Sequence, residues 1–230
     1  MIKAVLFDLD GTLVQIPNDV FEKHLFMGYA QIGAANGYDP KVFTGAVMKG
    51  YHAMVENQSD KTNDKVFYDV FSTIITDKNF EECEAMFDKY YRTNFNDLQS
   101  LNTIKLDLKQ KLGELRAKGI KLALATNPMF PLSAIETRLN WVGLTASDFD
   151  FITTYSNMKR GKKYIEYYTH VLEQLNVAPQ HAFMVGNSVD EDMKAVELGC
   201  QGFLVTEPNI NIDTDMYLTG TLEEFFLHVK

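Results

Sequence analysis

The first apolar run of the chain ends at a polar turn, a pattern that is compatible with few folds. Residues 3–7 read Lys-Ala-Val-Leu-Phe, and Asp8, Asp10 and Gly11 follow directly. A short apolar run that stops at a polar turn is typical of a strand buried on both faces of a parallel sheet. Open α/β folds bind their ligands at the carboxyl ends of such strands. The sequence therefore predicts that Asp8 stands at the functional edge of a parallel sheet.

Similar apolar runs recur in the second half of the chain, separated by helical patterns. The runs are 121–125, 182–185 and 202–205, and the clearest helical patterns are 104–115 and 165–175. Alternation of buried strands with amphipathic helices indicates βαβ units. We therefore expect an α/β fold built on a doubly wound, Rossmann-like parallel sheet.

Residues 15–98 differ in style, because they contain several helical patterns and no convincing buried strand. One pattern runs from about residue 18 to residue 35, and aromatic residues at helical spacing mark the others, which we interpret as core packing. This change in sequence pattern predicts an all-helical insertion over 15–98 and an α/β core formed by 1–14 and 99–230.

Short polar sequences predict where several helices begin. A proline at the first helical position, or a polar residue followed three positions later by glutamate, is a frequent helix start. Such sequences are Asp39-Pro40, Asn79 with Glu82, Ser133 with Glu136, and Thr221 with Glu224.

Asp8 and Asp10 form a pair of closely spaced carboxylates. Two carboxylates this close repel each other unless a proton or a cation lies between them. Mg²⁺ prefers oxygen ligands of this kind. One carboxylate of such a pair can attack phosphorus while the other gives and takes a proton. An isolated Asp-x-Asp pair is also compatible with a purely acidic turn, so the pair alone leaves both interpretations open.

The pentapeptide Asp8-Leu9-Asp10-Gly11-Thr12 resembles the signature of the haloacid dehalogenase superfamily. The resemblance implies a catalytic nucleophile at Asp8 and a general acid/base at Asp10. It also implies that residues 15–98 are a helical cap domain inserted after the first strand. The family continues with a threonine or serine, a lysine and an acidic motif, and this chain offers candidates in that order.

Thr126 and Asn127 follow the second core strand, where the resemblance implies phosphate binding. Lys162 occupies the place of the catalytic and phosphate-binding lysine, although Lys163 replaces the proline that usually follows it in the family. Lys159 and Arg160 lie close by, so a solvated basic turn is the alternative for any one of these residues.

The last motif, Gly186-Asn187-Ser188-Val189-Asp190-Glu191-Asp192, is similar to the family's glycine-aspartate loop. Asn187 stands where the family has an aspartate, so the site has one negative charge fewer. The resemblance implies a Mg²⁺ cofactor held by Asp8, Asp10, Asn187 and Asp192. Asp192 has the alternatives of holding a water or orienting Lys162. Asp190 has those of reaching the metal or starting a helix that ends at Gly199.

Asp10 discriminates among the reactions of the superfamily. Dehalogenases place a tyrosine at this position, and phosphonate-cleaving members an alanine. A carboxyl group gives a proton to an ester oxygen more readily than either. We therefore expect a Mg²⁺-dependent phosphatase that hydrolyses a small phosphorylated metabolite, such as a sugar phosphate or a nucleoside monophosphate, through an aspartyl-phosphate intermediate. A phosphomutase and a catalytically weak phosphate-binding or regulatory protein are the alternatives.

Composition limits the partners of the chain. A formal net charge of −9 disfavours a nucleic acid polymer, no apolar stretch is long enough for a membrane helix, and the N-terminus does not resemble a secretion signal. We expect a cytoplasmic protein, monomeric or homodimeric, with Cys83 and Cys200 as free thiols. Several residues of the insertion are candidates for contacting the substrate, without a sequence signal that selects among them: Lys23, His24, Lys49, Tyr51, His52 and Arg92.

Overall fold

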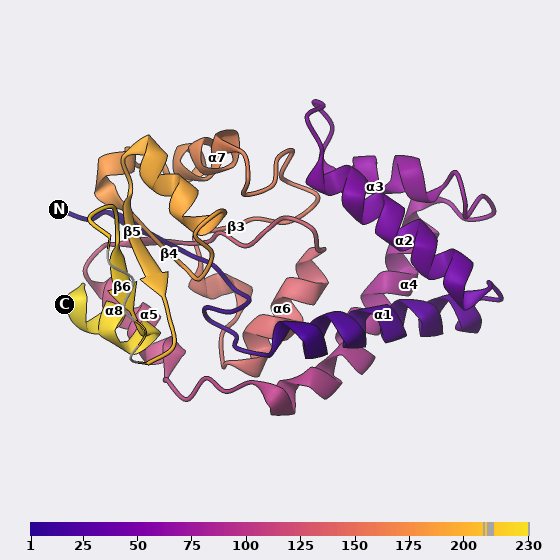
Figure 1. Ribbon diagram of the computed structural model, residues 1–230, viewed down its shortest axis with the longest axis horizontal. Coiled ribbons are helices and arrows are strands. Elements are labelled where there is room, and N and C mark those ends of the chain that lie inside the picture. The colour runs from indigo at the N-terminus through magenta and orange to yellow at the C-terminus, as the bar shows by residue number, and fades with distance from the viewer. Residues whose placement is uncertain (209, 211–213, 230) are drawn as a thin grey trace.

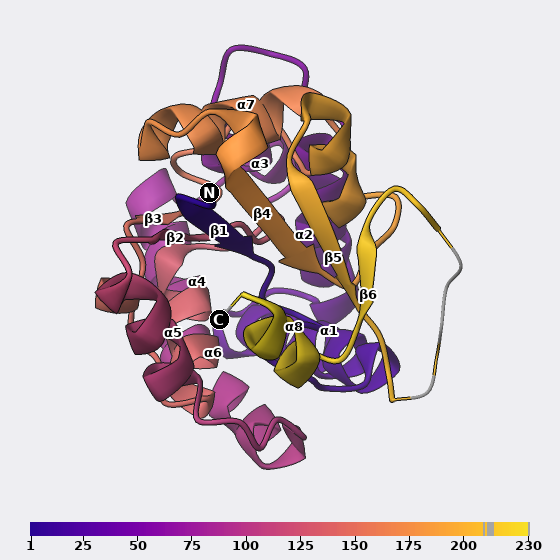
Figure 2. The same cartoon turned by 90° about the vertical axis from the view of Figure 1, so that its left-hand side faces the viewer.

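The computed structural model describes residues 1–208, 210 and 214–229 and contains one parallel sheet of six strands. The strands are β1 (Ala4–Phe7), β2 (Lys121–Leu124), β3 (Phe151–Ile152), β4 (Ala182–Gly186), β5 (Gln201–Val205) and β6 (Leu218–Gly220). Their order is β3-β2-β1-β4-β5-β6, which Figure 2 shows from one side to the other. The predicted α/β fold with a doubly wound parallel sheet is confirmed.

The four strands with long apolar runs were expected, whereas β3 and β6 were not. Both lie at the edges of the sheet, and β3 has only two residues, each half-buried. In β6, Leu218 is exposed and the next two residues are half-buried. Edge strands of this kind lack the continuous apolar run by which a central parallel strand is recognised.

Helices cover both faces of the sheet, as Figures 1 and 2 show. Val5 and Phe7 of β1 pack in a hydrophobic cluster with α5 (Leu108–Ala117), α6 (Leu132–Trp141) and α8 (Leu222–His228). Ala4 and Leu6 point to the opposite face, where they share a cluster with α7 (Ile165–Leu175) and the short 3₁₀ helix η4 (Asp192–Leu198). Two further 3₁₀ turns are η2 (Ala146–Asp148) and η3 (Pro179–His181). Because β1 alternates between two apolar clusters, it is buried on both faces as predicted.

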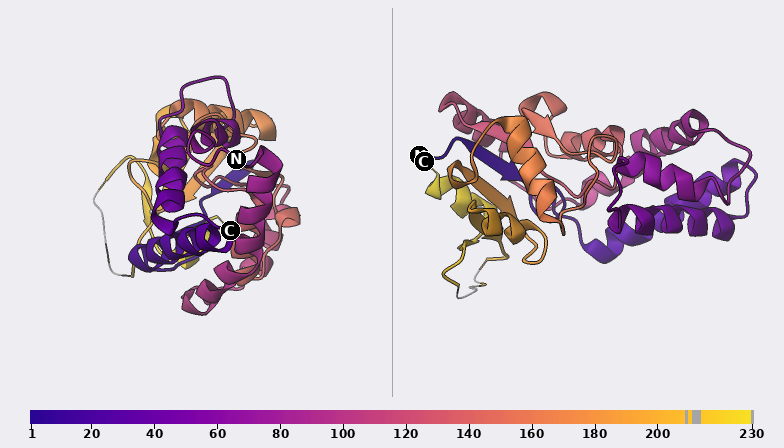
Figure 3. Two further views of the ribbon diagram at one scale, coloured as in Figure 1. Left: turned by 90° about the vertical axis from the view of Figure 1, so that its right-hand side faces the viewer. Right: turned by 90° about the horizontal axis from the view of Figure 1, so that it is seen from above.

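A second helical group lies beyond the carboxyl edge of the sheet, at the right of Figure 1 and in the right-hand view of Figure 3. It consists of α1 (Asn18–Ala35), α2 (Pro40–Val55), α3 (Asn63–Phe71), α4 (Phe80–Arg92) and the 3₁₀ segment η1 (Asn94–Leu101). We call these elements the cap; every residue from 15 to 98 is described and none forms a strand. Across the described part of the chain, no helix combines the length and apolarity needed to cross a membrane. The boundaries 15 and 98 remain a prediction.

Three of the four predicted helix starts are confirmed. Asp39 accepts hydrogen bonds from the first turn of α2, and Asn79 with Glu82 forms a reciprocal capping box on α4. Thr221 and Glu224 do the same on α8. The start predicted at Ser133 is wrong, because α6 begins after Pro131 and buries Ser133 inside its first turn. The helix expected near Asp190 is a 3₁₀ segment that starts at Asp192, and it ends at Gly199 as predicted.

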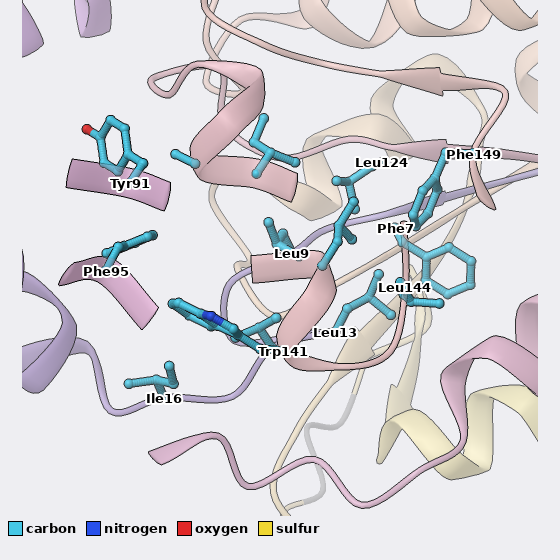
Figure 4. Close-up of a cluster of buried hydrophobic side chains, with 14 of the residues drawn as sticks. Phe7, Leu9, Leu13, Ile16, Tyr91, Phe95, Leu124, Trp141, Leu144 and Phe149 are labelled. Atoms are coloured by element: carbon cyan, nitrogen blue, oxygen red, sulfur yellow. The ribbon is translucent and has the colours of Figure 1, made fainter. Parts of the chain in front are cut away.

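One hydrophobic cluster joins the cap to the α/β core, and Figure 4 shows its centre. Phe95 of η1 lies 5.2 Å, between ring centroids, from Trp141 of α6. The Trp141 indole Nε1 donates a hydrogen bond of 2.9 Å to Asn96 of η1. The cap is therefore anchored beside α6, whose N-terminal end reaches the carboxyl edge of the sheet.

Candidate active site

Asp8 occupies the central point of the carboxyl edge. Phe7, the last residue of β1, pairs with Leu124 of β2 and Val185 of β4. The Asp8 amide continues this ladder by donating to the Val185 carbonyl over 2.9 Å, and the residue is only 6% exposed. Segments that follow β2 and β4 must therefore flank Asp8, as the parallel register requires.

Lys162 is the cation that contacts Asp8. Its Nζ forms an ion pair with Asp8 Oδ1 and lies 2.6 Å from Asp192 Oδ1. All three side chains are buried. The second Asp192 oxygen accepts from the Ser188 amide at 2.9 Å. Asp192 is thus fixed between a backbone donor and Lys162, so its contacts favour the predicted alternative of orienting the lysine.

The other basic residues of the turn make contacts away from Asp8. Lys163 pairs with Glu56 of the cap at 2.6 Å, and Lys159 lies 3.7 Å from Asp60. Arg160 donates to the Ser59 carbonyl at 2.6 Å. These exposed or partly exposed side chains connect the turn to the cap, whereas Lys162 alone among them is buried against Asp8.

Burial changes the acid strength of the Asp8–Lys162 pair. Loss of water disfavours the carboxylate and raises the pKa of Asp8 to about 7, with the nearby Asp192 and Asp10 charges adding to the effect and the Lys162 ammonium opposing it. Burial acts to lower the pKa of Lys162, but Asp192 and Asp8 outweigh it and raise that pKa above its ordinary value. Lys162 is therefore a permanent positive charge at the position of the predicted nucleophile.

Asp10 contacts a residue that the sequence reasoning missed. Its carboxylate, 36% exposed, forms an ion pair with Arg138 Nη1 on α6. Arg138 is fully buried; its Nε donates to the Ala134 carbonyl at 3.1 Å, and its guanidinium carbon lies 4.5 Å from the centroid of the Phe130 ring. Within the described residues, Nη2 has no hydrogen-bond partner. The sequence did contain a signal for this residue: Arg138 follows Ala134 and Ile135 at helical spacing, so it falls on the apolar face of α6.

Thr126 and Asn127 follow β2 as predicted and are held by different contacts. The Thr126 carbonyl accepts from the Thr153 hydroxyl at 2.7 Å and from the Tyr167 hydroxyl at 2.8 Å. Asn127 donates to Glu191 at 3.1 Å, and its side-chain oxygen lies 3.4 Å from the Lys162 amide nitrogen. Both residues are therefore at the same edge as Asp8, and their role in phosphate binding stays a prediction.

Asn187 packs against the turn that follows Asp8. Its Oδ1 lies 3.4 Å from the Thr12 hydroxyl, and a Cβ added at Gly11 would lie 2.3 Å from its Nδ2. Gly11 has φ +81°, so both space and backbone conformation require glycine there. Among the described residues, no group of three or more His, Cys, Asp or Glu side chains is arranged to hold a metal. The oxygen-rich edge of Asp8, Asp10 and Asn187 nevertheless matches the donor chemistry that Mg²⁺ prefers.

A cavity of about 510 Å³ lies between the carboxyl edge of the sheet and the cap. Asp10 and Glu191 line it from the core. Helices α1, α2 and α4 contribute Phe21, Tyr51 and Tyr91, among others. Of the residues suggested for substrate contact, Tyr51 lines this cavity; Lys23, His24, Lys49, His52 and Arg92 do not.

Comparisons with known proteins identify a family and agree with the observed fold. A model of the family described as haloacid dehalogenase-like hydrolase matches residues 2–198. Pyrophosphatase PpaX of Bacillus velezensis is 25% identical over 199 residues, which cover 86% of this chain and 80% of the relative. A HAD phosphatase from Thermococcus onnurineus has a TM-score of 0.61 at 20% identity, with 99% of this chain and 98% of that chain covered. CbbY from Rhodobacter sphaeroides, in complex with phosphate, has a TM-score of 0.58 at 18% identity, with 98% and 96% covered.

Proposed function

The chain belongs to the haloacid dehalogenase-like hydrolases, and on this premise we propose that it is a Mg²⁺-dependent phosphatase acting on a small phosphorylated metabolite. The observation that carries the proposal is the buried Asp8, which ends the central strand in an ion pair with the buried Lys162. Asp10, two residues away, lines the adjacent cavity. A nucleophile, its counter-charge and a proton donor are thereby combined at one edge of the sheet.

In the first step, an Asp8 carboxylate oxygen attacks phosphorus, and the bond from phosphorus to the leaving oxygen breaks. This step requires the protonated form of Asp10, which gives its proton to that oxygen, so the alcohol leaves neutral and Asp8 carries the phosphoryl group. In the second step, Asp10 takes a proton from water, and the resulting hydroxide attacks phosphorus. The P–O bond to Asp8 breaks, which releases inorganic phosphate and regenerates both carboxyl groups.

The surrounding residues support this sequence electrostatically. Lys162 offsets charge on Asp8 and on the transferring phosphoryl group, and Asp192 holds Lys162 in place. When bound, Mg²⁺ would shield the anionic phosphate from Asp8. Asp8, Asp10 and Asn187 have the oxygen atoms to hold it, whereas both Asp192 oxygens already have donors, from Lys162 and Ser188.

The observed ion pairs favour an enzyme over a protein that only binds phosphate. Binding alone does not require a buried carboxylate, because such a group repels the phosphate dianion. A nucleophile does require one, together with the counter-charge that Lys162 supplies.

The proposal is tested with purified protein and p-nitrophenyl phosphate. We expect phosphate release that depends on Mg²⁺ and stops on addition of a chelator. Asp8→Asn should abolish turnover, whereas Asp19→Asn, an exposed acidic position in the first turn of α1, should leave it unchanged. Full activity of the Asp8→Asn protein would refute the assignment of the nucleophile.

A further inference from the structure

We propose that the cavity next to Asp10 selects phosphate monoesters whose leaving group is an aromatic body without a second anionic group. This inference rests on the proposed phosphatase activity and names the substrate class of that same site. The cavity holds the leaving group rather than the phosphoryl group, because Asp10, the residue assigned to protonate the leaving oxygen, is part of its lining.

Aromatic residues are almost half of the cavity lining. Nine of its nineteen lining residues are phenylalanine or tyrosine, and they come from both the cap and the core. Phe21, Phe67 and Phe87 stand on α1, α3 and α4, while Phe130 and Tyr155 face them from loops of the core. Aromatic rings bind other rings through stacked or edge-to-face contacts in addition to apolar burial. A cavity of about 510 Å³ is within the usual range for a small-molecule site.

Several of the polar groups in these walls are already occupied. The Tyr29 and Tyr91 hydroxyls bond each other at 3.1 Å, and the Tyr155 hydroxyl donates to Glu84 at 2.8 Å. These tyrosines therefore offer mainly their rings to a ligand. A sugar, which needs a hydrogen bond for each buried hydroxyl, would leave several of its own hydroxyls unpaired here.

The charges of the lining exclude a second phosphate. Among the described residues that line the cavity none is lysine, arginine or histidine, whereas Asp10, Glu22 and Glu191 are acidic. Arg138, a buried cation that lies against the Phe130 ring of the lining, is already paired with Asp10. A bisphosphate would place its second phosphate among carboxylates without a counter-charge. The cavity therefore disfavours the phosphomutase alternative, whose reaction passes through a sugar bisphosphate, and accepts a neutral or cationic body.

The decisive experiment compares primary alkyl phosphates, so that the basicity of the leaving oxygen is nearly constant. With Mg²⁺ present, we expect kcat/KM for 2-naphthylmethyl phosphate to exceed that for glucose 6-phosphate by about 100-fold, a discrimination typical of an apolar pocket. Fructose 1,6-bisphosphate should be the poorest substrate. Equal or greater kcat/KM for glucose 6-phosphate or fructose 1,6-bisphosphate would overturn the inference.

A charge-insertion variant tests the cavity itself. Met48 of α2 lines it, so Met48→Lys should lower kcat/KM for 2-naphthylmethyl phosphate and raise it for fructose 1,6-bisphosphate. Val42→Lys adds the same charge on the same helix at a position that is 53% exposed and outside the cavity, and it should change neither value. Equal effects of the two variants would overturn the inference. p-Nitrophenyl phosphate separates the two proposals. If it is hydrolysed but the sugar phosphates are preferred to 2-naphthylmethyl phosphate, only the substrate class is refuted. If no ester is hydrolysed, the phosphatase and the inference are refuted together.

Discussion

Replacing Asp10 with alanine removes the ion-pair partner of a fully buried arginine. Arg138 is 0% exposed; its other polar and cation–π contacts are one backbone hydrogen bond from Nε and the rings of Phe130 and Phe21. Breaking a buried ion pair by deleting one partner costs about 3–5 kcal/mol, because the other charge stays desolvated. Asp10 itself is 36% exposed, so we expect the lower end of that range for Asp10→Ala.

The size of the effect can be measured by urea denaturation and thermal unfolding. A loss of about 3 kcal/mol corresponds to a fall in Tm of roughly 6–12 °C for a chain of this length. The double variant Asp10→Ala with Arg138→Met should recover at least about 2 kcal/mol relative to Asp10→Ala, because it removes the orphaned charge and retains apolar volume. Asp60→Ala is the matched control: its carboxylate is fully exposed, and its loss should be nearly neutral.

The two measurements can contradict the reasoning separately. If Asp10→Ala unfolds within about 0.5 kcal/mol of the parent protein, the buried guanidinium does not depend on Asp10. If the double variant is no more stable than Asp10→Ala, the loss does not come from an unpaired Arg138. Both outcomes are independent of catalysis, so they also distinguish the structural role of Asp10 from its proposed acid/base role.

Two further predictions concern the charges around Asp8. Lys162→Met should lower kcat by roughly 10²–10³-fold, because it removes the counter-charge of the transferring phosphoryl group. The Lys163 ammonium bonds Glu56 of the cap, so Lys163→Met should retain most of the activity. Steady-state kinetics with p-nitrophenyl phosphate measure both variants, and equal losses would contradict the assignment. Asn187→Asp should lower the Mg²⁺ concentration for half-maximal activity by roughly tenfold, because it adds an anionic oxygen to the proposed ligand set; a Mg²⁺ titration that is unchanged would show that residue 187 is not a ligand.

The sequence was sufficient for the parts of the fold that a single burial pattern defines. Central strands such as β1 and β4 are buried on both faces and therefore read as uninterrupted apolar runs. Capping boxes such as Asn79 with Glu82 depend on residues three positions apart and were equally readable. Ser133 has the same spacing with Glu136, but Pro131 sets the start of α6 earlier, so the local signal was misleading.

The site was less predictable where a side chain acts across the fold. Residue type and local pattern alone do not distinguish Lys162 from Lys163, so the choice of Lys162 depended on the family resemblance. In the structure, they differ in that Lys162 meets a carboxylate from a distant strand. The Arg138–Asp10 pair joins residues 128 positions apart, so its existence depends on how α6 packs at the carboxyl edge. Aromatic residues of the insertion, such as Phe87, were interpreted as core packing; Phe87 is indeed buried, but it also lines the cavity.

The charges of the site bear on how the proposed phosphoryl transfer would proceed with Asn187 in place of an aspartate. Asp8, Asp10 and Asp192 contribute three carboxylates, and the buried Lys162 and Arg138 contribute two cations. Full ionisation would leave one excess negative charge, and an aspartate at position 187 would make it two. The asparagine lowers the repulsion that an incoming phosphate dianion meets, at the cost of weaker attraction for Mg²⁺. A substitution at residue 187 should therefore change the affinity for Mg²⁺ and the affinity for the anionic ester in opposite directions. We expect Asn187→Asp to raise KM for the ester when it is measured at saturating Mg²⁺.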